Sequence, residues 1–189
     1  MRTFSQWIGY LIISLYPKSE VDGIRVIFTD IEADRPKCKA RLHRALDAGA
    51  GAGRRYDALL KRIRYFVIHP GDTPFADSAG GIHIPSADLL GLDEFALASV
   101  LIHESVHLRI SARGIQYEPQ CRERIERLCV KEQARFLRTV PDGGEEMARE
   151  AEELLAFPWW TPEQREADLK RLFDEHNIPQ WLRGIVRRG

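Results

Sequence analysis

The sequence is poor in cysteine, has no excess of charge of either sign and contains no hydrophobic run long enough to cross a bilayer. It has 189 residues and three cysteines, Cys38, Cys121 and Cys129, which are odd in number and lack close metal-ligand spacing. These features argue against a disulfide framework and favour a reducing compartment. We therefore expect a cytoplasmic protein without a transmembrane span.

The balance of charge argues against a strong attraction to polyanions. Lys and Arg together number 28, as do Asp and Glu, so the formal net charge is zero. No global field would draw such a chain to nucleic acid or to an anionic membrane. Arginines are dense between Arg122 and Arg138, but glutamates alternate with them, which is typical of a solvated helix face. We expect no direct binding of nucleic acid.

The most apolar segment runs from Trp7 to Tyr16. Ten residues are too few to span a bilayer, and no small-residue cleavage site precedes Pro17. The segment is therefore predicted to be a packed N-terminal helix, with N-terminal membrane association or export as the alternative.

Residue patterns along the chain indicate an α+β fold. Alternating and β-branched runs predict strands at residues 24–29, 64–69 and 81–84. Apolar periodicity and capping residues predict helices at 36–46, 56–63, 93–111, 119–138 and 145–156, and another that begins at Thr161. The Ala/Gly run 48–53 is expected to be a flexible connection. Strands precede most of the helices, so residues 1–140 are predicted to form the main domain and residues 141–189 a helical extension packed on it.

The predicted helix 93–111 contains the segment His103-Glu104-Ser105-Val106-His107. Residues four apart lie on one face of a helix, about 6 Å apart along its axis, so both histidines can bind one metal ion. Glu104 is turned about 100° from His103, which places it beside the metal as a base for water. The alternative is a pair of core histidines that bond to the backbone.

A third metal ligand is expected on or just before the next helix, where the carboxylates are Glu118, Glu123, Glu126 and Glu132. If the two helices pack antiparallel, the midpoint of His103 and His107 lies about 9 Å from the turn and Glu126 about 10 Å from it. Glu126 also falls in the apolar sector of its helix. It is our predicted ligand and Glu132 is the second choice, with a salt bridge from Glu126 to Arg122 as the structural alternative.

These residues resemble the HExxH zinc metallopeptidases of the gluzincin type, over roughly residues 81–137. The resemblance implies a zincin-like fold, in which a small mixed sheet and the motif helix precede a largely helical C-terminal half. It implies Zn²⁺ held by His103, His107 and Glu126, and a metal-activated water whose proton Glu104 accepts as general base. It also implies that the strand Gly81–Ile84 lines the cleft and pairs with an extended peptide or protein substrate.

Enzymes of this type add a donor for the oxyanion, and His83, Tyr117 and His69 are equal candidates by sequence. A protein that regulates so small an enzyme is compatible with this interpretation. Two other functions stay open: a deformylase-like zinc hydrolase and a catalytically silent module with the same fold. The first needs a cysteine as its third ligand, and Cys38, the only cysteine before the motif, stands in no such context.

Overall fold

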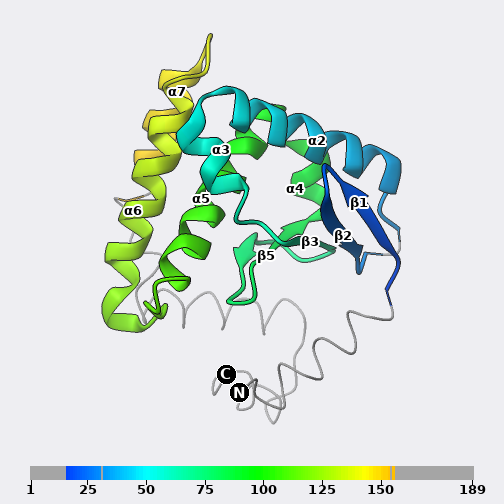
Figure 1. Cartoon of the computed structure of the whole chain (residues 1–189). Helices are drawn as coiled ribbons and strands as arrows, with labels where there is room; N and C mark the ends of the chain where they lie inside the picture. Colours follow the sequence, from blue (N-terminus) through cyan, green and yellow to red (C-terminus); the bar gives the residue numbers. More distant parts are fainter. Residues whose placement is uncertain (1–15, 31, 154, 156–189) are drawn as a thin grey trace, which may run out of the picture.

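A computed structural model describes residues 16–30, 32–153 and 155 (Figure 1). The predicted helices at the N-terminus and from Thr161 lie almost wholly outside the described residues, as does most of the predicted extension 141–189. Within the described part of the chain, no helix is long and apolar enough to cross a membrane.

The sheet has five strands in the order β1-β2-β3-β5-β4. The first two, β1 (Lys18–Val21) and β2 (Ile24–Phe28), form an antiparallel hairpin. Its turn needs positive φ at both central residues, and Asp22 and Gly23 supply it with φ values of 51° and 78°. β2 then pairs in parallel with β3 (Tyr65–His69), and β3 in parallel with β5 (Gly81–Pro85).

The second edge of the sheet is β4 (Phe75–Ala76), which pairs antiparallel with β5. The strand predicted at 81–84 is therefore present, but both of its edges are paired within the sheet, which contradicts the expectation that it pairs with an extended substrate. β5 lies between β3 and β4, and the edge of the sheet is the two-residue strand β4, in a segment where the sequence predicts no strand. So short a strand leaves no alternating pattern in the sequence.

Six described helices accompany this sheet, so the mixed α+β class is confirmed. They are α2 (Arg35–Gly51), α3 (Arg54–Leu60), α4 (Ser86–Gly91), α5 (Glu94–Ser111), α6 (Pro119–Leu137) and α7 (Gly144–Glu153). Alternate residues of β2, β3 and β5 join the core on one face of the sheet, among them Phe28, Phe66 and Ile82. α2 and α5 pack over this core, and α6 and α7 continue the helical side beyond α5 (Figure 1).

The Ala/Gly run is not a flexible connection, because α2 continues through it to Gly51. Gly49 is buried there, and a Cβ atom at this position would lie 2.7 Å from Cδ1 of Leu60. The small residues thus let α3 pack closely against the last turns of α2. The small residues of the Ala/Gly run serve close packing between helices. Composition alone does not distinguish such a run from a flexible linker.

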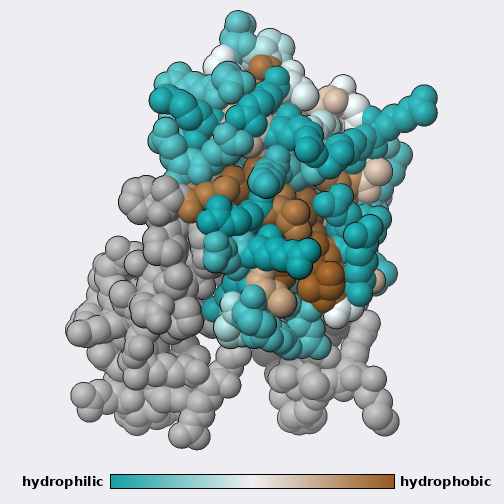
Figure 2. Space-filling view, turned by 90° about the vertical axis from the view of Figure 1, so that its left-hand side faces the viewer, coloured by the Kyte–Doolittle hydropathy of each residue, from teal (hydrophilic) through white to brown (hydrophobic). Residues whose placement is uncertain are grey.

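The outward face of α6 is solvated, as predicted. Arg124, Arg127, Lys131 and Arg135 are all exposed, and Leu128 is 46% exposed among them. From the α6 side of the molecule, hydrophobic side chains gather in the middle of the surface and hydrophilic side chains border them (Figure 2).

Candidate metal centre

The motif helix α5 begins where the sequence predicts. Asp93 caps it by accepting hydrogen bonds from the backbone amides of Phe95 and Ala96. Apolar residues on both sides of the motif, including Leu101, Ile102 and Val106, are fully buried. This burial holds the helix rigidly in the core, so His103 and His107 keep a fixed orientation toward α6.

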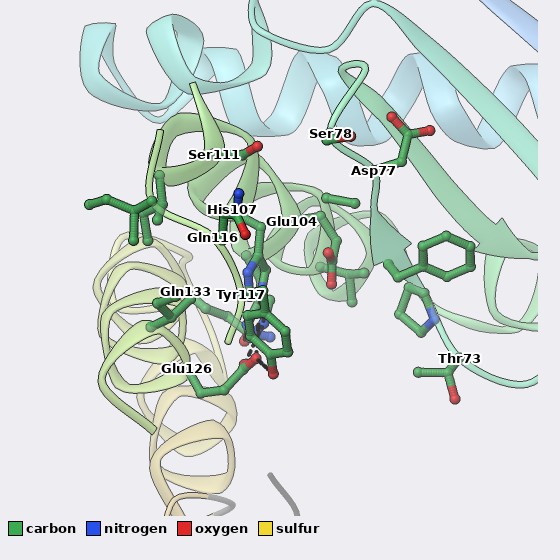
Figure 3. Close-up of a pocket in the computed structure, with 18 of the residues that line it drawn as sticks. Thr73, Asp77, Ser78, Glu104, His107, Ser111, Gln116, Tyr117, Glu126 and Gln133 are labelled. Atoms are coloured by element: carbon green, nitrogen blue, oxygen red, sulfur yellow. Dashed lines mark hydrogen bonds and ion pairs between the residues drawn. The ribbon is translucent and has the colours of Figure 1, made fainter. Parts of the chain in front are cut away.

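The two histidines and Glu126 converge on one point. Figure 3 shows Glu126 on α6 pointing toward His107 and Tyr117. The Nε2 atoms of His103 and His107 lie 3.3 Å apart. Glu126 Oε2 lies 3.4 Å from Nε2 of His103, and Glu126 Oε1 lies 3.6 Å from Nε2 of His107. The structure therefore brings together the three residues predicted as metal ligands.

Glu126 is almost completely buried, with 2% of its surface exposed. Burial raises the pKa of its carboxyl group, but the nearby rings of His103 and His107 and the hydrogen bond from Tyr117 outweigh burial and lower the pKa to about 2. Its Oε2 atom has no hydrogen-bond partner of good geometry. A charged oxygen left in this state inside a protein is costly, and a bound cation would satisfy it.

Glu104 lies beside the histidines and is also buried. Burial raises the pKa of its carboxyl group, and the nearby rings of His103 and His107 partly oppose the shift. The carboxylate accepts a hydrogen bond from the backbone amide of Ala76 on β4. The motif helix and the edge strand are thus joined through the predicted general base.

An open pocket of about 890 Å³ lies over this cluster. Residues 73–78 around β4 line one side, and Gly114–Tyr117, between α5 and α6, line another (Figure 3). The charged residues of the lining are Asp77, Glu104 and Glu126, with no Lys or Arg among its described residues. Phe75, Ile115 and Tyr117 are exposed apolar side chains at its walls.

Tyr117 is the one oxyanion-donor candidate that lies in this pocket. Its hydroxyl donates a hydrogen bond to Glu126 Oε1, and its ring centroid lies 5.5 Å from that of His107. Burial and the neighbouring Glu126 raise its pKa, so the hydroxyl stays protonated. The alternative partner of Glu126, Arg122, instead places its guanidinium 5.3 Å from the Tyr117 ring centroid.

His83 and His69 are not among the described residues that line the pocket. His83 Nε2 lies 3.0 Å from Asp77 Oδ2, and the His83 ring stacks on Phe75 with centroids 4.1 Å apart. His69 accepts a hydrogen bond from the Gly71 amide at 3.0 Å. Both histidines belong to the β3–β5–β4 side of the sheet, away from the HExxH pair.

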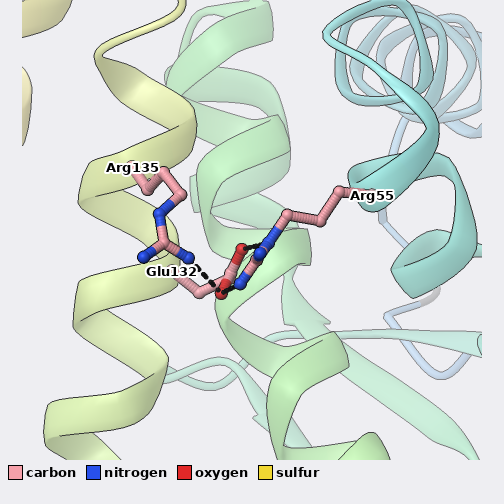
Figure 4. Close-up of polar contacts among 3 residues, drawn as sticks. All are labelled: Arg55, Glu132 and Arg135. Atoms are coloured by element: carbon pink, nitrogen blue, oxygen red, sulfur yellow. Dashed lines mark hydrogen bonds and ion pairs between the residues drawn. The ribbon is translucent and has the colours of Figure 1, made fainter.

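Glu132, the second choice as ligand, is engaged elsewhere (Figure 4). Arg55 donates two hydrogen bonds to its carboxylate, and Arg135 Nη1 lies 3.2 Å from Oε2. Burial raises the pKa of Glu132, but its bonds to Arg55 and the charge of Arg135 lower it. The other two carboxylates also have local partners, since Glu123 pairs with Arg127 and Glu118 accepts from Gln120.

Two residues beside the histidines were not assigned a role from the sequence. Cys129 Sγ lies within 4.8 Å of a ring nitrogen of each histidine, whereas Cys38 is buried on α2 near Asp34 and Asp30. Gln133 Oε1 lies 3.1 Å from Nδ1 of His103. Cys129 and Gln133 both follow Glu126 on the apolar face of α6. A polar glutamine on an otherwise apolar helix face is the sequence signal that could have identified Gln133.

Neither a known protein family, nor a curated protein, nor a solved structure matches this chain.

Proposed function

We propose that this protein is a zinc-dependent hydrolase with a zincin-like fold, and that it is a metallopeptidase. The observation that carries the proposal is the spacing of the three ligand atoms. Tetrahedral zinc with bonds of about 2.0–2.1 Å requires nitrogen and oxygen ligands about 3.3–3.4 Å apart. The distances of 3.3, 3.4 and 3.6 Å among His103, His107 and Glu126 are close to this requirement.

The chemistry of the donors supports the same assignment. Two imidazoles and one carboxylate form the three-ligand set of catalytic zinc sites, which leave a fourth position for water or substrate. The unpartnered Oε2 atom of Glu126 provides the ligand charge. A zinc ion bound here would supply Lewis-acid activation of a water molecule and of a substrate carbonyl.

The chain itself would move the proton. Glu104 faces the pocket with one carboxylate oxygen anchored by the Ala76 amide, which fixes its orientation. As a general base, Glu104 would accept a proton from water and return it to a leaving amine. Of the three oxyanion-donor candidates, only Tyr117 lies within the pocket; its hydroxyl donates to Glu126 in this structure and would have to turn from Glu126 to donate to a developing oxyanion.

The shape of the pocket favours an extended substrate. It is open, and the edge strand β4 runs along one wall. An unpaired strand edge offers backbone groups to an extended peptide, while side chains of that peptide enter pockets on either side. A peptide or protein substrate is therefore proposed over a small polar molecule.

The test is the metal content of untagged protein, measured by elemental analysis for the wild type, His103→Ala, Glu126→Ala and Glu104→Gln. We expect near-stoichiometric zinc in the wild type and in Glu104→Gln, and loss of zinc from the two ligand variants with their fold retained by circular dichroism. Cleavage of a peptide mixture, abolished by chelation and restored by zinc, tests the peptidase assignment. A folded wild type that binds no zinc on titration would disprove the metal site.

One observation favours a second candidate, a non-peptidase zinc hydrolase with a thiolate ligand. Cys129 is fully buried, and its sulfur lies within 4.8 Å of a ring nitrogen of each histidine. In this hypothesis the thiolate ligand is Cys129, because Cys38 lies on α2. The spectroscopic comparison of Glu126 and Cys129 given below separates the two candidates.

A further inference from the structure

A chain of hydrogen bonds links the backbone of α5 to His103 through α6. Ser99 Oγ donates to the backbone carbonyl of Ala96 at 2.8 Å. Gln133 Nε2 donates to Ser99 Oγ at 3.2 Å, and Gln133 Oε1 lies 3.1 Å from Nδ1 of His103. We propose that Ser99 and Gln133 together fix the proton of neutral His103 on Nδ1, which keeps the lone pair of Nε2 free for a metal. The inference rests on the proposed zinc site.

The direction of each bond follows from what each atom can donate. The single hydroxyl proton of Ser99 is used on the Ala96 carbonyl, so toward Gln133 the Ser99 oxygen can only accept. The NH₂ group of Gln133 must therefore face Ser99, which leaves its carbonyl oxygen facing His103. A carbonyl oxygen accepts only, so Nδ1 of His103 has to carry a proton.

The opposite side of the ring has two neighbours. Nε2 of His103 lies 3.3 Å from Nε2 of His107, where two facing N–H groups would repel, and 3.4 Å from Glu126 Oε2, a carboxylate oxygen that attracts a proton to Nε2. The preference for a proton on Nδ1 therefore has to come from Gln133 and Ser99. In water, neutral histidine prefers its proton on Nε2, so the protein must supply the preference for Nδ1.

Burial makes the arrangement effective. Ser99 is 3% exposed, so water does not readily replace it, and Gln133 is half-buried at the wall of the pocket. Gln133 follows Glu126 by two helical turns, and Ser99 precedes His103 by one. One pair of helices thus holds the ring from both sides, with Glu126 at Nε2 and Gln133 at Nδ1. Gln133 and Ser99 are positioning residues, because they act through His103 and do not contact the metal themselves.

The direct test is nitrogen NMR of histidine-labelled, metal-free protein at alkaline pH, where the His103 ring is neutral. The His103 signals are assigned by comparison with His103→Gln. We expect the wild type to carry the proton on Nδ1, and a proton on Nε2 would overturn the inference. This spectrum of the wild type decides the matter even where a variant fails to fold.

Variants connect the tautomer to metal binding. Gln133→Leu keeps the size of the side chain but accepts no hydrogen bond, so the proton should shift toward Nε2. Zinc affinity, measured by competition with a chromophoric chelator, should fall about 10–100-fold, the usual cost of losing such a partner. Gln133→Glu keeps an acceptor for Nδ1–H and should retain both the tautomer and zinc binding. Gln120→Leu, at an exposed position of the same helix, is the matched control and should change neither.

The outcomes separate this inference from the proposed function. Unchanged tautomer and unchanged affinity in Gln133→Leu would overturn the inference and leave the zinc site in place. A wild type that carries the proton on Nδ1 but binds no zinc would refute the proposed function, while the role of Ser99 and Gln133 in setting the tautomer would stand.

Discussion

Glu126 and Cys129 lie one helical turn apart on α6, and both reach toward His103 and His107. The carboxylate oxygens are within 3.6 Å of the ring nitrogens, whereas the sulfur is known to lie within 4.8 Å. A zinc–sulfur bond of about 2.3 Å would require a separation from the nitrogens of about 3.5 Å. Both side chains are within reach of a shared metal, and chemistry favours Glu126: its buried Oε2 atom has no hydrogen-bond partner, whereas burial raises the pKa of the Cys129 thiol and disfavours a thiolate.

Cobalt substitution tests this assignment. We expect Co²⁺-loaded wild-type protein to show no near-ultraviolet charge-transfer band from sulfur to cobalt. Cys129→Ala should bind zinc with affinity close to that of the wild type, and Glu126→Ala should lose it. A sulfur-to-cobalt band that disappears in Cys129→Ala would instead assign the thiolate as a ligand and favour the second candidate function.

Glu104→Gln should bind zinc normally and lose turnover by about 10²–10⁴-fold, because an amide cannot accept the proton of the attacking water. The rate is measured on a peptide that the wild type is shown to cleave. Glu153→Gln, an exposed carboxylate on α7, serves as the control. Retained cleavage by Glu104→Gln would exclude Glu104 as the general base.

The sequence identified those parts of the site that depend on local spacing. His103, Glu104 and His107 lie within five residues of one helix, so the helical repeat alone predicts their arrangement. Glu126 required one further assumption, that α5 and α6 run antiparallel. The structure agrees, because Glu126 faces His103 and His107 while Gln133 faces Ser99 and His103.

Features that depend on distant residues were not predictable. The helical wheel of α6 places Glu132, like Glu126, in the apolar sector, and the partner that engages Glu132 instead of a metal is Arg55, 77 residues away in sequence. The edge strand was missed for a similar reason. A strand of two residues is too short to show an alternation of apolar and polar residues. β4 forms because it pairs with β5 and because the hydrogen bonds of Asp77 hold the turn that follows it.

The ion pair of Glu132 predicts a pH dependence of stability. Arg55 and Arg135 lower the pKa of Glu132 in the folded state, so the pair contributes stability above the unfolded-state pKa of 4.5 and loses it as the pH falls through the lower folded-state pKa. Glu132→Gln should lower the free energy of unfolding by about 1 kcal/mol at neutral pH, because both arginines are about half exposed and screened.

Urea unfolding of chelator-treated protein at several pH values measures this effect. The difference between the wild type and Glu132→Gln should shrink as the pH falls below 4.5. A difference that is constant across this range would show that the substitution acts through packing and not through the charge of Glu132.

The close packing around Gly81 predicts that a substitution in β5 affects the pocket. A Cβ atom at this position would lie 2.2 Å from the Tyr65 ring and 2.6 Å from Asp77 Oδ2. Tyr65 donates a hydrogen bond to that same oxygen at 2.5 Å, and Asp77 holds the turn after β4 by accepting from the amides of Ala79 and Gly81. Gly81→Ala therefore has to displace the ring or the carboxylate, at a cost of about 1–3 kcal/mol in stability.

The displacement should also reach the general base, because the residue before Asp77 is Ala76, whose amide holds Glu104. We expect Gly81→Ala to unfold at lower urea concentration and, in an enzyme assay, to lower kcat with zinc content unchanged. Gly91→Ala is the matched control, since nothing lies within 4 Å of the added methyl group there. Equal stability of the two variants would mean that Tyr65 and Asp77 move aside freely, and that the edge strand is not held by the contacts of Asp77.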